Sequence, residues 1–181
     1  MFKRVAIIGT SGSGKTTLGI QIAEKTRIPY VDIDSLNWQA GWQTTPLEEF
    51  REKVERTLTR HEVWICGGNY SKVRDIIWGR ADTILWLDYP LPTIMTQLCK
   101  RTLHRILFQE DLWATGNIET WQKQFLSRES LFLWVLKTRP RHHREYPKLF
   151  ASPEYQHIKT IRFYSPQQTE NWLRNLPSSV G

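Results

Sequence analysis

Short apolar runs of strand length alternate with longer, helix-like polar segments along most of the chain. The runs are rich in β-branched and aromatic residues and cover residues 5–8, 30–33, 63–66, 83–87 and 158–163. Strand-sized apolar runs that alternate with helical segments are typical of a parallel sheet with helices on both faces. The pattern therefore predicts an α/β fold.

Two helix starts carry capping signals. Residues 45–48 read Thr-Pro-Leu-Glu and residues 165–168 read Ser-Pro-Gln-Gln, so each has a hydroxyl, a proline and then Glu or Gln. This spacing predicts helices capped by Thr45 and Ser165. The stretch 91–155 looks helical, with interruptions expected at Gly116, Pro140 and Pro147.

A glycine-rich loop follows the first apolar run. Residues 9–16 read Gly-Thr-Ser-Gly-Ser-Gly-Lys-Thr and match the Walker A pattern G-x-x-x-x-G-K-[ST] between a strand and a helical segment. In such a P-loop, backbone N–H groups surround phosphate oxygens, the lysine reaches the β- and γ-phosphates and the hydroxyl binds Mg²⁺. A dinucleotide site is disfavoured, because the spacing is not G-x-G-x-x-G. We expect ATP and Mg²⁺ as cofactors, with the nucleotide bound by Gly9, Thr10, Ser11, Gly12, Ser13, Gly14, Lys15, Thr16 and Thr17.

Two acids stand at the end of the second apolar run. Asp32 and Asp34 are separated by one residue, so the period of a strand points both to the same side. We expect Asp32 to hold Mg²⁺ with Thr16, and Asp34 to orient or deprotonate an acceptor hydroxyl. The alternative is that both acids begin a solvated loop.

The acceptor is expected to lie near two further segments. Trp38 and Trp42 follow Asp34 closely, and the third apolar run is followed by Gly67, Gly68 and Asn69. Indoles can wall a pocket, paired glycines permit close approach and an amide can donate and accept. We therefore expect Asp34, Trp38, Trp42, Gly68 and Asn69 to bind the acceptor. The alternative for residues 67–71 is a turn before a helix that begins near Ser71.

Basic residues recur in the second half of the chain. Arg101 and Arg105 are four residues apart on one helical face, which suits gripping phosphate oxygens, and we expect both to be catalytic together with Lys15 and Asp34. A lid carrying such arginines would exclude water. The alternative is a solvated basic face. Further cationic groups follow at Arg128, Lys137, Arg139, Arg141 and Arg144.

The remaining aromatic and imidazole groups divide between core and lid. We expect Trp64, Trp86 and Trp172 to be core residues, because they lie in strand or terminal-helix patterns. Trp113, Trp121 and Trp134 fall in the candidate lid, and His142 and His143 are expected at the surface.

Composition adds a location and excludes some classes. The chain has 181 residues, a formal net charge of +7 and two cysteines, Cys66 and Cys99, without metal-binding spacing. The longest apolar run, residues 131–136, is far shorter than the about 18 residues of a membrane span. We expect a single cytoplasmic domain with no membrane partner.

The motifs together resemble the small P-loop kinases, a group that includes adenylate, shikimate and gluconate kinases. Within it the chain is similar to adenylate-kinase-like bacterial proteins labelled DNA topology modulation protein (FlaR-related). The resemblance runs through Ile33 to Trp38, Gly41-Trp42 with Pro46, Trp64 to Ser71, Trp86 to Asp88, Arg101 to Arg105, Leu112-Trp113, Gly116-Asn117 and Glu119.

This resemblance implies a nucleoside-monophosphate-kinase-like fold: a five-stranded parallel sheet with the P-loop strand at its centre, flanked by helices and covered by a helical lid. It implies one domain over residues 1–181, with a substrate-binding segment at about 34–60 and a lid at about 105–145. Two positions depart from the group. Gly67 stands where an acid is common, and Gln97 where an arginine is common.

The sequence thus predicts an ATP-binding phosphotransferase that moves the γ-phosphate of Mg·ATP to a small-molecule or nucleotide acceptor that the motifs do not identify. An NTP-hydrolysing switch is one alternative. Another is an ATP-binding protein associated with nucleic acid, which would rest on the +7 charge and the basic run 137–148. Oligomeric state does not follow from the sequence.

Overall fold

The computed structural model describes residues 2–122, 124, 127 and 130–177. Its centre is a five-stranded sheet in the order β2-β5-β1-β6-β9, in which every pair of neighbours is parallel. The strands are β1 (Arg4–Gly9), β2 (Tyr30–Asp32), β5 (Trp64–Gly67), β6 (Thr83–Leu87) and β9 (Lys159–Phe163). The strand that leads into the glycine-rich loop is central, so the expected α/β fold is confirmed.

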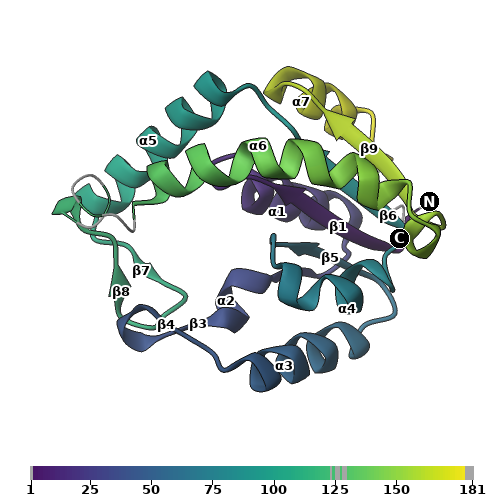
Figure 1. Cartoon of the computed structure of the whole chain (residues 1–181), viewed down its shortest axis with the longest axis horizontal. Coiled ribbons are helices and arrows are strands. Elements are labelled where there is room, and N and C mark those ends of the chain that lie inside the picture. The colour runs from purple at the N-terminus through teal and green to yellow at the C-terminus, as the bar shows by residue number, and fades with distance from the viewer. Residues whose placement is uncertain (1, 123, 125–126, 128–129, 178–181) are drawn as a thin grey trace.

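Helices cover both faces of this sheet, and α6 passes across its front in Figure 1. They are α1 (Lys15–Thr26), α2 (Ile33–Asn37), α3 (Leu47–Thr59), α4 (Arg74–Trp78), α5 (Leu91–Leu107), α6 (Leu131–Phe150) and α7 (Pro166–Arg174), with short 3-10 turns η1 (Ala40–Trp42), η2 (Ser71–Val73) and η4 (Pro153–Tyr155). Small antiparallel hairpins join β3 (Trp38–Gln39) to β4 (Gln43–Thr44) and β7 (Asp111–Leu112) to β8 (Asn117–Ile118).

The alternation of side chains along β1 builds two hydrophobic cores. Ala6 and Ile8 pack into one cluster with residues of α3, α4 and the end of α6. Val5 and Ile7 pack into the other, with α1, α5 and α7. Each fully buried aliphatic side chain contributes about 1.5–3 kcal/mol, so both faces of the central strand fix its position.

Tyr30 explains why Gly67 stands where an acid is common in the group that the sequence resembles. Its ring lies between α1 and β5, where a Cβ at Gly19 would collide with the ring and a Cβ at Gly67 would collide with the hydroxyl. That hydroxyl therefore occupies the space of a side chain at the end of β5. Burial, reinforced by the nearby Asp32, raises the pKa of Tyr30, so it is neutral and not a replacement for the acid.

Of the two expected caps, one is confirmed and one is wrong. Ser165 precedes α7 and accepts from Gln168 N at 3.3 Å, while Gln168 Oε1 accepts from Tyr164 N at 2.8 Å. Thr45 does not cap α3, which begins at Leu47 without a side-chain cap. Its buried hydroxyl instead donates to Leu36 O at 3.1 Å. A contact with α2 has replaced the local cap.

Of the three interruptions expected in the second half of the chain, one is confirmed and two are wrong. Gly116, with φ of 74°, lies in the turn of the β7–β8 hairpin, as expected of a break. Pro140 and Pro147 were expected to interrupt the helix, which is wrong, because α6 runs through both. Both prolines are exposed, while Val135, Thr138, His142 and Tyr146 form the buried side of α6. Packing of that side maintains the helix despite the missing N–H donors.

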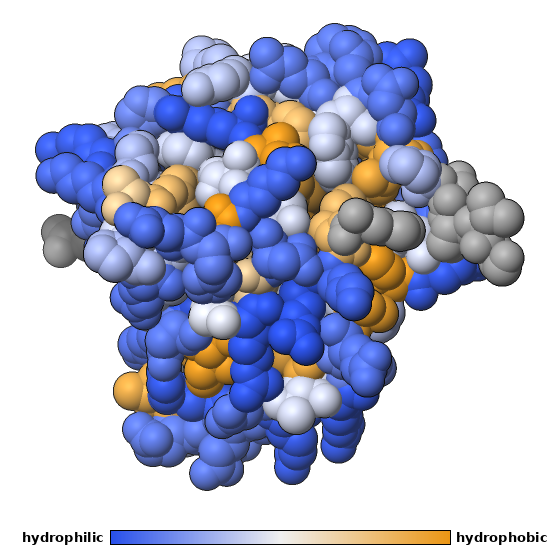
Figure 2. Space-filling view, turned by 90° about the vertical axis from the view of Figure 1, so that its right-hand side faces the viewer, coloured by the Kyte–Doolittle hydropathy of each residue, from blue (hydrophilic) through white to orange (hydrophobic). Residues whose placement is uncertain are grey.

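The aromatic core expectations are largely met. Trp64 and Trp86 are buried, whereas Trp172 is half-buried and stacks on Phe2 with ring centroids 6.2 Å apart. Figure 2 shows a mostly hydrophilic face with separate hydrophobic patches, on the side of the molecule that is at the right in Figure 1. No helix among the described residues is long and apolar enough to cross a membrane.

Candidate functional site

A cleft of about 550 Å³ lies at the carboxyl ends of β1, β2 and β5. It is bounded by the P-loop, the segment from α2 to the start of α3, the loop after β5, α5, the β7–β8 hairpin and α6. Most of the residues expected at the site line it: Gly9, Thr10, Ser11, Lys15, Thr16, Asp32, Asp34, Trp38, Trp42, Asn69, Arg101 and Arg105. The fold thus collects side chains that are far apart in the sequence.

The P-loop has the backbone that its glycines allow. Gly12 and Gly14 have φ of 83° and 90°, in the left-handed region where a Cβ is disfavoured. Lys15 Nζ donates to the carbonyl oxygens of Gly9 at 2.9 Å and Thr10 at 3.2 Å, so the ammonium lies across the loop. Burial lowers the pKa of Lys15, while the nearby Asp34 acts in the opposite direction. The loop leads into helix α1, so the Lys15 side chain starts from the N-terminal, positive end of that helix.

Donors for phosphate oxygens remain at this loop. Ser13 Oγ and Arg101 Nε are buried and have no hydrogen-bond partner among the described residues. Arg101 Nη2 lies 3.4 Å from Ser11 Oγ, which places the guanidinium beside the loop. Burial and the neighbouring Arg105 lower the pKa of Arg101 to about 10, so it is still charged at pH 7. These groups fit an anionic ligand such as a triphosphate.

Asp34 reaches the cleft by a different route from the one expected. The strand β2 ends at Asp32, and Asp34 lies in the first turn of α2, so the two acids do not alternate along one strand. Asp32 Oδ1 accepts from Asp34 N at 3.0 Å and thereby caps α2. Tyr70 Oη donates to Asp34 Oδ1 at 2.6 Å. Both carboxylates still line the cleft.

The environment of Asp32 limits its use as a metal ligand. Its Oδ2 accepts from the indole N–H of Trp113 at 3.0 Å. Burial and then Asp34 raise the pKa of Asp32. The described residues contain no group of three or more His, Cys, Asp or Glu that could hold a metal ion. Thr16 and Asp32 therefore fit a cation held mainly by phosphate oxygens and water, as Mg²⁺ usually is.

An aromatic wall, formed by Trp38, Trp42 and Trp113, lines the cleft near Asp34. The rings of Trp38 and Trp42 meet edge to face at 5.8 Å and 77°, and those of Trp42 and Trp113 at 6.4 Å and 85°. Trp42 and Trp113 both have φ of 60°, a left-handed conformation that is costly outside glycine. The surrounding contacts must hold these two residues in place.

Asn117 supplies such contacts and joins the two hairpins. It is 1% exposed, its Oδ1 accepts from Trp42 N at 2.8 Å and its Nδ2 donates to Gln39 O at 2.8 Å. Figure 1 shows the β3–β4 and β7–β8 hairpins side by side at one end of the molecule. The sequence did not identify Asn117 as a site residue. It entered only as part of Gly116-Asn117, one of the segments shared with the group that the chain resembles.

Arg105 is held by two acids that flank the β7–β8 hairpin. Its Nη1 lies 2.9 Å from Glu119 Oε1, and its Nε lies 3.6 Å from Glu110 Oε2. Glu119 is 2% exposed and also lines the cleft, but it was not among the expected site residues. The ion pair fixes Arg105 at the wall of the cleft, which Arg101 also lines.

The expectation that His142 is a surface residue is wrong. It is 8% exposed, and its Nδ1 is 3.2 Å from Asn69 Nδ2. Its ring stacks on that of Tyr146, with centroids 5.0 Å apart and ring planes at 5°. Tyr146 donates its hydroxyl to Asn69 Oδ1. Burial lowers the pKa of His142 to about 4, so the ring is neutral at pH 7. The unbroken α6 turns His142 inward, whereas His143 is exposed and lies 3.0 Å from Asp88.

Several other expected residues lie away from the cleft. Gly68 does not line it, because it packs on Ile33, where an added Cβ would lie 2.7 Å from Ile33 Cβ. Trp121 is exposed and does not line it either. Trp134 lines it from α6.

The further basic residues of the second half also lie in different places, and most of them are away from the cleft. Only Arg141 of those described lines the cleft. Arg139 donates to Tyr89 O at 3.0 Å and Arg144 to Pro140 O at 3.3 Å, while Lys137 is exposed on α6. Arg128 lies outside the described residues. A broad cover of arginines over the P-loop is therefore not found in the part of the chain that the structure describes.

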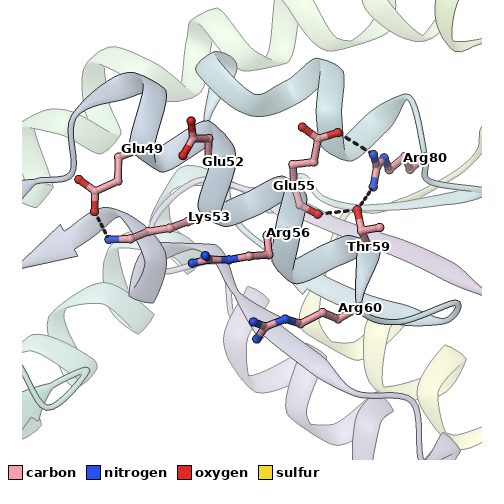
Figure 3. A pocket seen from close by; sticks show the side chains of 8 residues that line it. All are labelled: Glu49, Glu52, Lys53, Glu55, Arg56, Thr59, Arg60 and Arg80. Atoms are coloured by element: carbon pink, nitrogen blue, oxygen red, sulfur yellow. Dashed lines mark hydrogen bonds and ion pairs between the residues drawn. The ribbon is translucent and has the colours of Figure 1, made fainter.

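A second hollow, of about 760 Å³, lies on the outer side of α3 (Figure 3). Its charged groups pair with one another, with Lys53 Nζ 2.7 Å from Glu49 Oε1 and Arg80 Nη2 2.8 Å from Glu55 Oε1. None of the residues expected at the site lines it. The cleft at the P-loop is therefore the candidate site.

Known proteins share this combination of fold and motif. The sequence profile of the family described as Shikimate kinase matches residues 11–133. The chain is 27% identical over 133 residues to Uncharacterized protein YqaC of Bacillus subtilis, covering 73% of this chain and 74% of that protein. It is 26% identical over 131 residues to Shikimate kinase of Synechococcus elongatus, covering 65% of this chain and 68% of that protein. A gluconokinase structure from Sinorhizobium meliloti, 15% identical, superposes with a TM-score of 0.54 over 95% of this chain and 87% of that chain.

These similarities support the small P-loop kinase group that the sequence resembles, and none of the proteins just named carries the label of DNA topology modulation. The family profile covers well over half of the chain and includes the P-loop lysine and the cleft acids. The chain belongs to the shikimate kinase family of P-loop kinases and is an ATP-dependent kinase of small molecules.

Proposed function

We propose that the chain transfers the γ-phosphate of Mg·ATP to a hydroxyl group of a small molecule bound between the P-loop and the aromatic wall. One observation carries this proposal. Asp34, oriented by Tyr70 at 2.6 Å, shares the cleft with Lys15 and Arg101. A carboxylate acceptor of protons thus stands in the same cavity as two cations suited to a transferring phosphoryl group.

In this mechanism Asp34 accepts the proton of the acceptor hydroxyl as its oxygen bonds to the γ-phosphorus. The bond from that phosphorus to the bridging oxygen of ADP breaks, and the products are ADP and the phosphate ester. Lys15 and Arg101 offset negative charge on the transferring group and on ADP. Tyr70 keeps one carboxylate oxygen of Asp34 occupied, so the other is available to the acceptor.

The nucleotide phosphates would lie on the backbone N–H groups of residues 9–17. Thr16 would contribute its hydroxyl to Mg²⁺ and Asp32 would hold it through water. The cation would supply charge neutralisation between the β- and γ-phosphates. The hydrogen bond from Trp113 to Asp32 supports a role of Asp32 through water, because both carboxylate oxygens already accept a hydrogen bond.

We assign acceptor binding to the segment of residues 34–60 and the lid to residues 105–145. Asn117 links these segments, which supports a cover that excludes water during transfer. Such a cover favours a kinase over an NTP-hydrolysing switch. The finer resemblance to proteins labelled DNA topology modulation protein remains an expectation.

The test is Mg·ATP consumption by the purified full chain with a panel of hydroxyl compounds: sugars, cyclic polyols, hydroxy acids, nucleosides and nucleoside monophosphates. One acceptor class should stimulate ADP release, and Lys15→Ala should abolish the stimulation. Hydrolysis at the same rate with and without every acceptor would instead support a nucleotide switch.

A further inference from the structure

We propose that the acceptor is an uncharged cyclic polyol or sugar, whose ring lies against the aromatic wall and whose hydroxyl groups bind neutral side chains. This inference rests on the proposed function and specifies its acceptor. The observations that carry it are the indole geometry, the place of the cations and the neutral polar groups of the inner cleft.

The indoles are built into the site. Trp38 and Trp42 come from the β3–β4 hairpin and Trp113 from the β7–β8 hairpin, and all three line the cleft. The backbones of Trp42 and Trp113 are held in a left-handed conformation, with the amide of Trp42 fixed by Asn117. Backbone strain of this kind clusters at ligand sites, and an indole there can offer its ring face to a ligand.

The angles between the rings favour a puckered ligand over a flat one. Successive indoles meet at 77° and 85°, so the ring of Trp42 forms a corner with each of its two neighbours and is parallel to neither. A planar base is bound best by stacking between or upon parallel rings. A sugar or cyclic polyol can place its C–H groups on one indole face and direct its hydroxyl groups outward toward polar side chains.

The cations of the cleft are badly placed for an acidic acceptor. Lys15 and Arg101 lie at the P-loop, and Arg105 is paired with buried Glu119. The other cations among the described lining residues, Lys72 and Arg141, are exposed, and Arg141 lies 3.8 Å from Glu145. A carboxylate deep in the cleft near Asp34 would be buried beside a like charge, which is costly without a dedicated cation.

Beside Asp34, the cleft also has polar groups that are neutral. Asn37 is 6% exposed and lies 3.5 Å from the Tyr70 hydroxyl, and Asn69 is oriented by Tyr146 and by His142. The buried imidazole of His142 is uncharged at pH 7. Amide and imidazole groups both donate and accept, as the hydroxyl groups of a polyol require.

The experiment compares matched acceptors with the purified full chain and saturating Mg·ATP. Each neutral ring compound is paired with its acid, for example a hexose with the corresponding uronic acid, and nucleosides form a third arm. The inference expects the neutral member to have the higher kcat/KM, by about tenfold or more. A preference for the acid or for a nucleoside would overturn it while leaving the kinase function intact, and no stimulation by any acceptor would overturn both.

Variants of the aromatic wall test where the ring of the acceptor binds. Trp38→Ala should raise the KM of the neutral acceptor by about tenfold, the loss of one aromatic contact, with the KM of ATP unchanged. Trp38→Phe should restore part of the affinity. Tyr164→Ala removes an exposed aromatic ring that lies outside both the cleft and the proposed lid, and it should behave like the wild type. A Trp38→Ala variant with unchanged acceptor KM, or an Arg141→Gln variant with a greatly raised one, would contradict the inference.

Discussion

The indole N–H of Trp113 donates a hydrogen bond of 3.0 Å to Oδ2 of Asp32. Trp113 follows β7 in the β7–β8 hairpin, and Asp32 ends strand β2 and caps the helix that carries Asp34. A single carboxylate therefore contacts the β7–β8 hairpin with one oxygen and the backbone of the proposed base with the other. The position of the β7–β8 hairpin and the orientation of Asp34 are linked through Asp32.

Replacement of Lys15 by alanine should remove the proposed phosphate cation. We expect Lys15→Ala to lower acceptor-dependent ATP turnover by about a hundredfold or more, because a fixed charge at the transferring phosphate is lost. Steady-state ADP release measures it. Lys53→Ala, on the outer side of α3, is the matched control. Turnover that survives in Lys15→Ala would remove the P-loop from the mechanism.

Asn117→Ala should loosen the cover of the cleft. The amide of Trp42 would lose its acceptor, and we expect a decrease of about 1–3 kcal/mol in the free energy of unfolding. Urea unfolding measures the stability, and the ratio of hydrolysis to transfer measures the cover. That ratio should rise, because water can enter. Asn175→Ala, at the exposed end of α7, is the control, and an unchanged ratio in Asn117→Ala would argue against a shared cover.

Gly67→Ala should destabilise the sheet through its collision with the Tyr30 hydroxyl. We expect a loss of about 1–3 kcal/mol, as for other overpacked core positions. Tyr30→Phe removes the colliding atom, so the double variant should recover part of the loss. A double-mutant cycle by urea unfolding measures the coupling. Strict additivity would show that Tyr30 does not fill the place of a side chain at position 67.

His142 should make stability depend on pH. Its pKa is about 4 in the folded chain, below the usual value of 6.5, so the unfolded chain binds more protons between these values. This contribution to stability is fully present above pH 6.5 and is lost as the pH falls toward 4. Thermal unfolding of the wild type and His142→Gln from pH 4 to pH 7 isolates it. We expect a smaller decrease in Tm on acidification for the variant. Equal slopes would contradict the burial of a neutral imidazole.

Local patterns predicted the five strands of the central sheet and the P-loop, because short-range periodicity and a contiguous motif determine both. The site residues that sequence missed depend on contacts between distant segments. Asn117 bonds to backbone groups 75 and 78 positions away, and Glu119 meets Arg105 only because the hairpin folds back. Thr45 does not cap α3 as expected, because its hydroxyl bonds to α2 instead. Packing keeps α6 helical through Pro140, and this continuous helix buries His142. These outcomes follow from packing, which local propensity does not encode.

The most direct test follows the γ-phosphate of labelled Mg·ATP in single turnovers of the wild type and Asp34→Asn. The proposed mechanism predicts that label moves to the acceptor in the wild type. Asp34→Asn should bind ATP equally well and transfer label about 10²–10⁴ times more slowly, the usual contribution of a positioned base. Label that appears only as inorganic phosphate in the wild type, or an Asp34→Asn variant that transfers it at the wild-type rate, would contradict the mechanism.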